Sequence, residues 1–370
     1  MKKIVCAHLY NDFSGSPLVL STIIKTFRSK GLPVEIITST ETPGFLTDLD
    51  AKLISNQYKF VNNRYLRLVL FLFCQLRMFF QTLRYRNKEV VIYVNTLLPF
   101  GVALAGKLMG KKVIYHFHET SLNPLLLKKF LKWIASITAT EVIYVSKFLK
   151  KQEGLPQVSG KVIYNCLSDE FIKTAKLNIP NRAKNKKFNV LMLCSLKTYK
   201  GVNQFVGLAK NLPKYNFELV LNATSEEIDH FFDKNILPEN LQLFPKQRNV
   251  HSFFKNSNLV LNLSQPEKWI ETFGMTLIEA MQYGLPVIAP PVGGPTEIVI
   301  PGFNGYLVDQ RDEKELYRKV KKIASDRKHY RRLSKNAIQY VDKFKKENLE
   351  DQILELIEPN GFRVKNYSLA

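Results

Sequence analysis

The sequence predicts an α/β protein with two doubly wound domains, and three observations support this prediction. At 370 residues, the chain exceeds what one hydrophobic core usually organises. It begins with an apolar strand at residues 3–8, an amphipathic helix at residues 18–30 and a second strand at residues 34–38, an order typical of a parallel sheet. A second strand, loop and helix of the same kind begins at residue 188.

A polar segment rich in lysine and arginine separates the two predicted domains. Residues 173–187 have this composition and contain Pro180, so we interpret them as a linker. The N-terminal domain then covers residues 1–172 and the C-terminal domain residues 188–345, and residues 346–370 form a final segment with a helix at 349–357. Further strands are expected at residues 90–94, 112–115, 142–146, 161–165, 217–221 and 259–263, and further helices at 99–109, from 202 onward and at 314–344.

Composition indicates a soluble globular protein, since 45% of the residues are apolar. The apolar run after Lys3 is too short for a signal peptide, and residues 68–76 fall short of a membrane span. The four cysteines form no CxxC pair, so we expect small buried thiols in a reducing cytosol and no zinc site. They are Cys6, Cys74, Cys166 and Cys194.

The chain is strongly basic. Its 54 lysines and arginines against 32 acidic residues give a formal net charge of +22. Such a charge points to nucleic acid, an anionic membrane or phosphorylated substrates. No RNP-like strand, zinc-finger spacing or basic heptad is present, so no nucleic-acid partner is expected.

Residues 264–297 contain the most informative pattern. A helix is predicted at residues 275–283, directly after Gly274, and a short buried strand at 287–289 leads to Gly293-Gly294 and another helix. Helix N-termini after glycine-containing loops bind anions. Glu271 and Glu279 can each accept two hydroxyl hydrogen bonds. The arrangement suits a diphosphate that carries a sugar at each end.

These motifs resemble retaining GT-B glycosyltransferases of family 4, the glycosyl transferases group 1. The resemblance rests on E-T-F-G-M-T-L-I-E-A-M at 271–281, G-L-P-V-I-A at 284–289 and G-G-P-T-E at 293–297, and it covers nearly the whole chain. It implies two Rossmann-like domains facing a cleft, with the last helix crossing back to the N-terminal domain. The alternative is a helix–strand unit of any α/β protein whose glutamates are solvated.

The resemblance implies a role for individual residues. His118 would face the transferred sugar, Lys200 would bind the diphosphate and Glu271 the sugar hydroxyls, so these three are the predicted catalytic residues. Glu279 would bind the ribose of the nucleotide. The remaining predicted donor-binding residues are Gly15, Ser195, Lys197, Gly201, Phe273, Gly274, Met275 and Thr276.

The chain departs from the family pattern at two places. Ser195 stands where the family has an arginine, with Cys194 in place of a glycine. Lys197 either supplies the missing positive charge or is a solvated loop residue, and a lysine does not offer the fork of an arginine. The family has a glycine-rich loop after its first strand, near the donor phosphates. Gly15 matches this loop, but Ser16-Pro17 stands where the family has its second glycine.

No metal or cofactor is expected. Asp48-Leu49-Asp50 is a D-x-D, but no apolar strand leads into it, so we interpret it as a surface turn. His116, His118 and Glu119 lack a further spaced ligand, and His116 is interpreted as a packed residue. Residues 101–107 resemble a Walker A motif that fails at Leu108. The nucleotide sugar is a substrate.

The expected function is transfer of a hexose from a nucleotide sugar to a glycan or lipid-linked acceptor in cell-surface polysaccharide assembly, without a metal. A lysine and aimed backbone N–H groups can stabilise the nucleoside diphosphate that leaves. Two rivals remain: a GT-B nucleotide-sugar epimerase or hydrolase, and a non-catalytic basic protein that binds nucleic acid. Steep salt dependence of binding to nucleic acid would favour the last.

A basic, apolar helix at residues 64–86 predicts a peripheral site on the inner, cytoplasmic face of an anionic membrane. Residues 51–88 contain no acidic residue. One stripe is expected to pack on the domain, and the opposite side, with Leu70, Phe71 and Met78 beside Arg67 and Arg77, is expected to face lipid. Alternatively, neighbouring elements cover both sides. The stripe comprises Val69, Leu72, Leu76, Phe79, Phe80 and Leu83.

Overall fold

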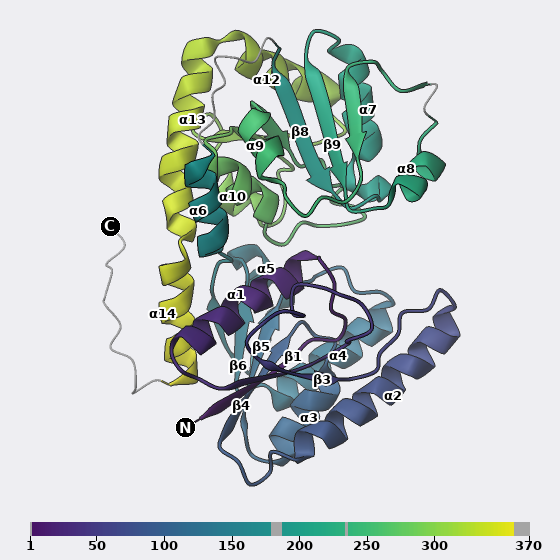
Figure 1. Cartoon of the computed structure of the whole chain (residues 1–370), viewed down its shortest axis with the longest axis vertical. Helices are drawn as coiled ribbons and strands as arrows, with labels where there is room; N and C mark the ends of the chain where they lie inside the picture. Colours follow the sequence, from purple (N-terminus) through teal and green to yellow (C-terminus); the bar gives the residue numbers. More distant parts are fainter. Residues whose placement is uncertain (1, 179–186, 234–235, 359–370) are drawn as a thin grey trace. The chain divides into compact units, whose positions relative to one another are not determined.

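The computed structural model describes residues 2–178, 187–233 and 236–358, and the chain forms two compact units (Figure 1). Of the described residues, the N-terminal unit comprises 2–165 and 347–358, and the C-terminal unit comprises those between Cys166 and Lys346. Each unit contains one parallel sheet. The predicted fold class, two doubly wound Rossmann-like domains, is therefore confirmed.

The N-terminal sheet has seven parallel strands, with the first strand of the chain inside it. Ile4 is aligned with Val34 on one side and with Val91 on the other. Its central strands are apolar along their whole length because both faces of a doubly wound sheet are covered. In spatial order the strands are β3 (Lys52–Ser55), β2 (Val34–Thr38), β1 (Lys3–Ala7), β4 (Val90–Asn95), β5 (Lys112–Phe117), β6 (Glu141–Tyr144) and β7 (Ser159–Val162).

The helices of this unit form two layers. The chain moves outward from β1 to β3 and then in the opposite direction from β3 to β7, so right-handed crossovers place the helices before and after this reversal on opposite faces. The first layer contains α1 (Gly15–Ser29) and α14 (Lys346–Ile357). The hydroxyl of Thr26 in α1 donates a 2.8 Å hydrogen bond to the carboxylate of Glu350 in α14. The second contains α2 (Arg64–Leu83), α3 (Phe100–Leu108), α4 (Leu125–Thr138) and α5 (Lys147–Glu153).

The C-terminal unit has a six-stranded parallel sheet with β8 inside it. Its strands in spatial order are β10 (Leu241–Phe244), β9 (Asn216–Leu221), β8 (Asn189–Cys194), β11 (Leu259–Leu261), β12 (Val287–Ala289) and β13 (Gly305–Leu307). The helices around it are α6 (Asp169–Leu177), α7 (Val202–Asn211), α8 (Ser225–Phe231), α9 (His251–Asn256), α10 (Met275–Gln282), α11 (Pro295–Ile298), α12 (Glu313–Ser325) and α13 (Arg327–Val341).

Two predicted segments differ in the structure. The predicted linker begins inside α6, which packs on the C-terminal unit through the ring of Phe171 against His251. Residues 179–186 of that linker lie outside the described residues. The charged helix predicted at 314–344 is two helices, because the carboxylate of Asp326 accepts a hydrogen bond from the N–H of His329 and caps a new helix there.

The prediction for α2 chose the wrong face. The structure buries Phe71, Cys74 and Met78 and leaves Val69 and Phe80 exposed, together with Leu72 and Leu76. Both sides of α2 are apolar, so helical periodicity alone could not distinguish them. The choice depends on α3: a side chain at Gly101 would come within 2.1 Å of the backbone oxygen of Gln75, so the two helices touch backbone to backbone there.

Within the described residues, α2 is also the one helix whose length and apolar composition would suffice to cross a membrane. The fold uses it differently, because α2 connects β3 to β4 of the same sheet and packs on α3 through Phe71 and Phe100, whose ring centroids lie 5.8 Å apart. It is a crossover helix with one buried face.

Candidate active site

A lysine–glutamate ion pair lies at the carboxyl end of the C-terminal sheet. The Nζ of Lys200 donates a 2.9 Å hydrogen bond to Oε2 of Glu271. Lys200 ends a short 3-10 helix, η2 (Thr198–Lys200), after β8, and Glu271 lies in the loop between β11 and α10. Their side chains are only 15% and 22% exposed, so water screens the pair weakly. In such sheets, ligands bind at the carboxyl ends of the strands.

Glycine is required where the chain turns after Lys200. Gly201 has φ +79°, and a Cβ there would lie 2.2 Å from the backbone oxygen of Leu263. A larger residue would therefore push η2 away from the chain that follows β11. The Lys200-Gly201 pair in the sequence thus has a geometric reason, since the glycine lets the lysine approach the loop that carries Glu271.

The second glycine pair holds the loop of Glu271 in place. The N–H of Gly294 donates a 2.8 Å hydrogen bond to the backbone oxygen of Glu271. A Cβ at Gly293 would lie 2.2 Å from that same oxygen, and one at Gly294 would lie 2.3 Å from the backbone oxygen of Thr272. The turn after β12 therefore packs against the Glu271 loop backbone to backbone. The helix that follows, α11, is a single turn, so its dipole is small.

Glu271 is held as a carboxylate. Burial tends to raise its pKa, but the charge and hydrogen bond of Lys200, with a further hydrogen bond from Asn262, outweigh burial and bring the pKa below its ordinary value. Glu271 is therefore ionised at neutral pH. A positive charge is thus fixed at this edge of the sheet, with an acceptor for hydroxyl groups beside it.

The helix α10 places three further predicted residues at the same edge. It starts at Met275, after Gly274, and the first N–H groups of a helix have no acceptor within the helix. Thr276 lies in this first turn, and Glu279 lies one turn further on. Burial raises the pKa of Glu279 to about 7. The carboxyl is therefore poised between its neutral and charged forms near neutral pH.

Two stacked aromatic residues that no sequence motif predicted lie at this site, and one of them contacts Lys200. The ring of Tyr199 stacks on that of Trp269, with centroids 5.5 Å apart and planes 17° from parallel. The Nζ of Lys200 lies 5.2 Å from the centroid of Trp269, within range of a cation–π contact. The W-x-E spacing before Glu271 is the signal that could have identified Trp269.

The remaining predicted residues of this unit play different parts. Ser195 is partly buried and Lys197 is exposed in the loop that follows β8. Burial raises the pKa of the Cys194 thiol to about 12, so this residue is a neutral packing group. Phe273 is 3% exposed and packs edge-on against Phe344, so its side chain supports the loop from the core.

A histidine cluster lies at the carboxyl ends of β1, β4 and β5 in the N-terminal unit. His118 is partly exposed, and its Nε2 lies 2.8 Å from Oδ1 of Asn95, whose Nδ2 lies 3.0 Å from Nδ1 of His8. Burial, with His116 and His8 nearby, holds the pKa of His118 well below its ordinary value. A neutral His118 therefore donates its Nε2–H to Asn95. No sequence motif singles out Asn95.

The neighbours of His118 differ from it. His116 is fully buried and hydrogen-bonded to the hydroxyl of Tyr93 at 2.8 Å, and its ring lies 4.2 Å from that of His118. The two histidines thus lie on the same side of the strand end, as alternation predicts. Burial raises the pKa of Glu119 to about 7. Gly15 is exposed at the first position of α1, at the same edge of the sheet.

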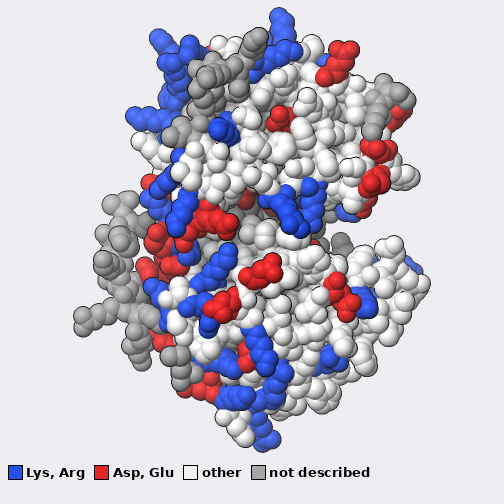
Figure 2. Space-filling model, in the orientation of Figure 1, with Lys and Arg blue, Asp and Glu red and all other residues white. Residues whose placement is uncertain are grey.

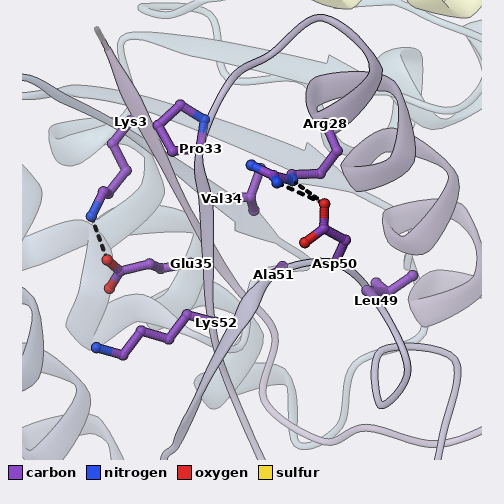
Figure 3. Close-up of a pocket in the computed structure, with 9 residues that line it drawn as sticks. All are labelled: Lys3, Arg28, Pro33, Val34, Glu35, Leu49, Asp50, Ala51 and Lys52. Carbon is purple, nitrogen blue, oxygen red and sulfur yellow. Dashed lines mark hydrogen bonds and ion pairs between the residues drawn. The ribbon is translucent and has the colours of Figure 1, made fainter.

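The D-x-D segment lies at the opposite edge of the N-terminal sheet. A pocket of about 370 Å³ is lined there by the first residues of β1, β2 and β3 and by Asp50 (Figure 3). Asp50 forms an ion pair with Arg28 at 2.6 Å. This is the amino end of the strands, away from the edge where such sheets bind ligands. No cluster of three potential metal ligands occurs among residues 2–178, 187–233 and 236–358.

Known proteins share parts of this sequence. Residues 174–340 match the family model described as Glycosyl transferases group 1. The chain is 28% identical over 273 residues to the uncharacterized glycosyltransferase MJ1178 of Methanocaldococcus jannaschii, across 70% of this chain and 72% of that protein.

Two solved structures share the fold. Anabaena Alr3699/HepE in complex with UDP and glucose superposes with a TM-score of 0.77 and 21% identity over 96% of this chain and 99% of that one. The lipopolysaccharide outer core galactosyltransferase WaaB, in its apo form, superposes with a TM-score of 0.72 and 19% identity, over 96% of this chain and 99% of that one.

The fold is therefore that of the GT-B glycosyltransferases, with two parallel-sheet Rossmann-like domains. Residues 174–340 match the model of the glycosyl transferases group 1, and the comparisons support glycosyltransferase activity. The Lys200–Glu271 pair and the start of α10 lie within the matched segment.

Proposed function

We propose that this protein is a retaining glycosyltransferase of family 4 that moves a hexose from a nucleotide sugar to a glycan or lipid-linked acceptor. The observation that carries the proposal is the Lys200–Glu271 ion pair, 2.9 Å long, at the edge of the sheet where α10 begins. A fixed cation, a helix N-terminus and two carboxyl groups at one edge match a sugar–diphosphate–nucleoside in charge and hydrogen bonding.

The leaving group explains why these residues would be catalytic. Breaking the bond between sugar and diphosphate places negative charge on the diphosphate, and Lys200 with the first N–H groups of α10 would stabilise it. Glu271 would orient Lys200 and accept hydrogen bonds from sugar hydroxyls. Glu279 would accept hydrogen bonds from the ribose, and His118 would supply a neutral polar group to the sugar.

The proposed donor is a UDP-hexose, handled without a metal. The support for uridine is the likeness to Alr3699/HepE, whose structure contains UDP and glucose. The support for metal independence is Lys200, which supplies at the sheet edge the positive charge that a divalent cation supplies to diphosphates elsewhere.

The proposed acceptor belongs to cell-surface polysaccharide assembly, and the proposed location is the cytoplasmic face of the cell membrane. The support for a lipid-linked glycan is the shared fold with the outer core galactosyltransferase WaaB. The four cysteines are all free thiols, which fits a reducing compartment.

A donor panel tests the proposal. Purified protein with EDTA is mixed in turn with UDP-, GDP- and TDP-sugars, and the unfolding temperature is measured. A bound donor raises it by mass action, and we expect the largest rise with a UDP-hexose. The same mixture should slowly release UDP and a sugar whose anomeric configuration, read by NMR, is that of the donor. Absence of binding and turnover with every donor would reject the proposal, and activity that EDTA abolishes would reject metal independence.

Trp269 is expected to position Lys200. Trp269→Leu removes the aromatic face beside the ammonium group, a contact worth about 1 kcal/mol, so kcat/KM should fall roughly fivefold. Trp269→Phe keeps a ring and should retain most of the activity. Steady-state kinetics on both variants checks this, and equal losses in the two would assign Trp269 a packing role only.

A further inference from the structure

The second helix layer of the N-terminal unit carries a concentration of exposed apolar side chains. Of the twenty large hydrophobic residues exposed in the described chain, fourteen lie on α2, α3 and α4. We call this set the α2/α4 face. Its members are Tyr65, Leu66, Leu68, Val69, Leu72, Phe73, Leu76 and Phe80 on α2, Leu108 on α3, and Leu125, Leu126, Phe130, Trp133 and Ile137 on α4.

The three helices form one continuous layer. Phe71 of α2 contacts Phe100 of α3, and Phe100 contacts Phe130 of α4, with ring centroids 5.8 Å and 5.5 Å apart. The layer is therefore rigid, and its outer side chains are presented by packed helices. Single exposed hydrophobic residues are ordinary, but a set gathered on one layer marks a binding surface.

The charged side chains that the three helices themselves carry are all basic. Residues 51–140 contain fourteen lysines and arginines but only two acidic residues, Glu89 and Glu119. None of α2, α3 and α4 contains an aspartate or glutamate. Arg64 at the start of α2 and Lys129 in α4 are exposed. Figure 2 shows the edge of the unit over α2, at the lower right, as largely uncharged.

We infer that the α2/α4 face docks on an anionic lipid bilayer. Apolar side chains would enter the boundary between headgroups and acyl chains, with Tyr65 and Trp133 at the headgroup level, where such rings are favoured. The basic residues would attract anionic headgroups, each contributing about 1 kcal/mol near such a surface.

Charge argues against the other occupant that this face allows. In a two-fold dimer the same patch would face itself, so Arg64 and Lys129 would meet only basic or uncharged residues of the three helices of a second copy. No acidic residue of the three helices is available to neutralise them. An anionic bilayer supplies the opposite charge together with an apolar interior.

The structure also determines the orientation of α2 on the bilayer. Its inner side is held by α3, where the N–H of Gly101 donates a 3.0 Å hydrogen bond to Oε1 of Gln75. The helix therefore lies parallel to the surface with only its outer side in lipid, and it does not span the membrane.

Flotation with lipid vesicles tests this inference. The full chain is mixed with vesicles of phosphatidylcholine alone, or of phosphatidylcholine with phosphatidylglycerol, and separated on a density gradient. Wild type should float with the anionic vesicles and remain at the bottom with the neutral ones. Absence of flotation with anionic vesicles, or equal flotation with both kinds, would overturn the inference.

Paired variants locate the surface. Phe73→Glu/Phe80→Glu on α2 and Leu126→Glu/Trp133→Glu on α4 change exposed side chains only, and each pair should lower the bound fraction at least roughly tenfold. Leu177→Glu, which changes an even more exposed apolar residue of α6, is the control and should float like wild type. Equal flotation of the paired variants and wild type would overturn the assignment of this face.

Charge is tested in the same way. Arg64→Glu/Lys129→Glu should lose flotation, whereas Lys210→Glu/Lys214→Glu, an equal charge change at exposed positions of the C-terminal unit, should not. Sedimentation of each protein without lipid tests the dimer, and a wild-type dimer that Phe73→Glu/Phe80→Glu makes monomeric would assign the face to self-association instead. Flotation requires no turnover, so its failure would leave the proposed transfer reaction standing.

Discussion

Lys200→Ala is expected to lower kcat/KM for the nucleotide sugar roughly a hundredfold to a thousandfold. The side chain is the one charged partner of Glu271 given by the described structure, and it would stabilise the diphosphate as the sugar leaves. Loss of one preorganised group that stabilises developing charge typically has an effect of this size. UDP release at saturating and limiting donor concentrations measures it.

A stability control is needed because the substitution leaves Glu271 without its cation. An unpaired buried carboxylate destabilises a fold by up to about 3–5 kcal/mol, and less here because the pair is partly exposed. The double variant Lys200→Met/Glu271→Gln removes both charges and should regain most of the stability in urea unfolding. It should remain inactive. Recovery of activity with stability would mean that the pair serves the fold and not the reaction.

Glu279→Gln is expected to stabilise the protein at pH 8 and not at pH 4.5. The folded-state pKa of Glu279 is about 7, above the ordinary value of 4.5. The folded state therefore binds the carboxyl proton of Glu279 more tightly than the unfolded state does. The stability that this proton contributes is complete below pH 4.5 and is lost as the pH rises to 7. Glutamine does not titrate. The difference in the free energy of unfolding between the variant and wild type should change by about 3 kcal/mol across this pH window.

The same variant should bind the donor more weakly. A carboxylate accepts stronger hydrogen bonds from ribose hydroxyls than an amide does, by about 1.5 kcal/mol, so the donor Kd should rise about tenfold at pH 8. In wild type, donor affinity should increase as pH rises through 7, because binding favours the charged form. Isothermal titration calorimetry at pH 6 and pH 8 measures both. A pH-independent Kd in wild type would exclude Glu279 from the ribose site.

Local sequence was sufficient for much of the candidate site. Glu271, Gly274 and Glu279 lie within nine residues, and the helix between them and the strand at 287–289 follow from local propensity and glycine positions. Lys200-Gly201 is also recognisable locally, because it lies in the loop that follows the strand predicted at residues 188–194. Such patterns can be interpreted without tertiary structure because the residues that define them are neighbours in the chain.

Contacts between distant residues could not be predicted in this way. Trp269 meets Lys200 across 69 positions of the sequence, and Asn95 meets His118 across 23. Motifs in the sequence identify Lys200 and His118 but not their partners. Side chains at the ends of neighbouring parallel strands meet because of strand order, and strand order is a property of the whole sheet.

The sequence by itself determined the fold class, most of the strands and the residues of the Glu271–Glu279 segment, because burial on both faces of a parallel sheet and the caps of helices leave local signals. Tertiary structure decided which side of α2 is buried. Both its buried side and its exposed side carry large apolar residues, so the spacing of these residues does not select a face. The contact between Gly101 and Gln75 selects it, and leaves Val69, Leu72, Leu76 and Phe80 outside.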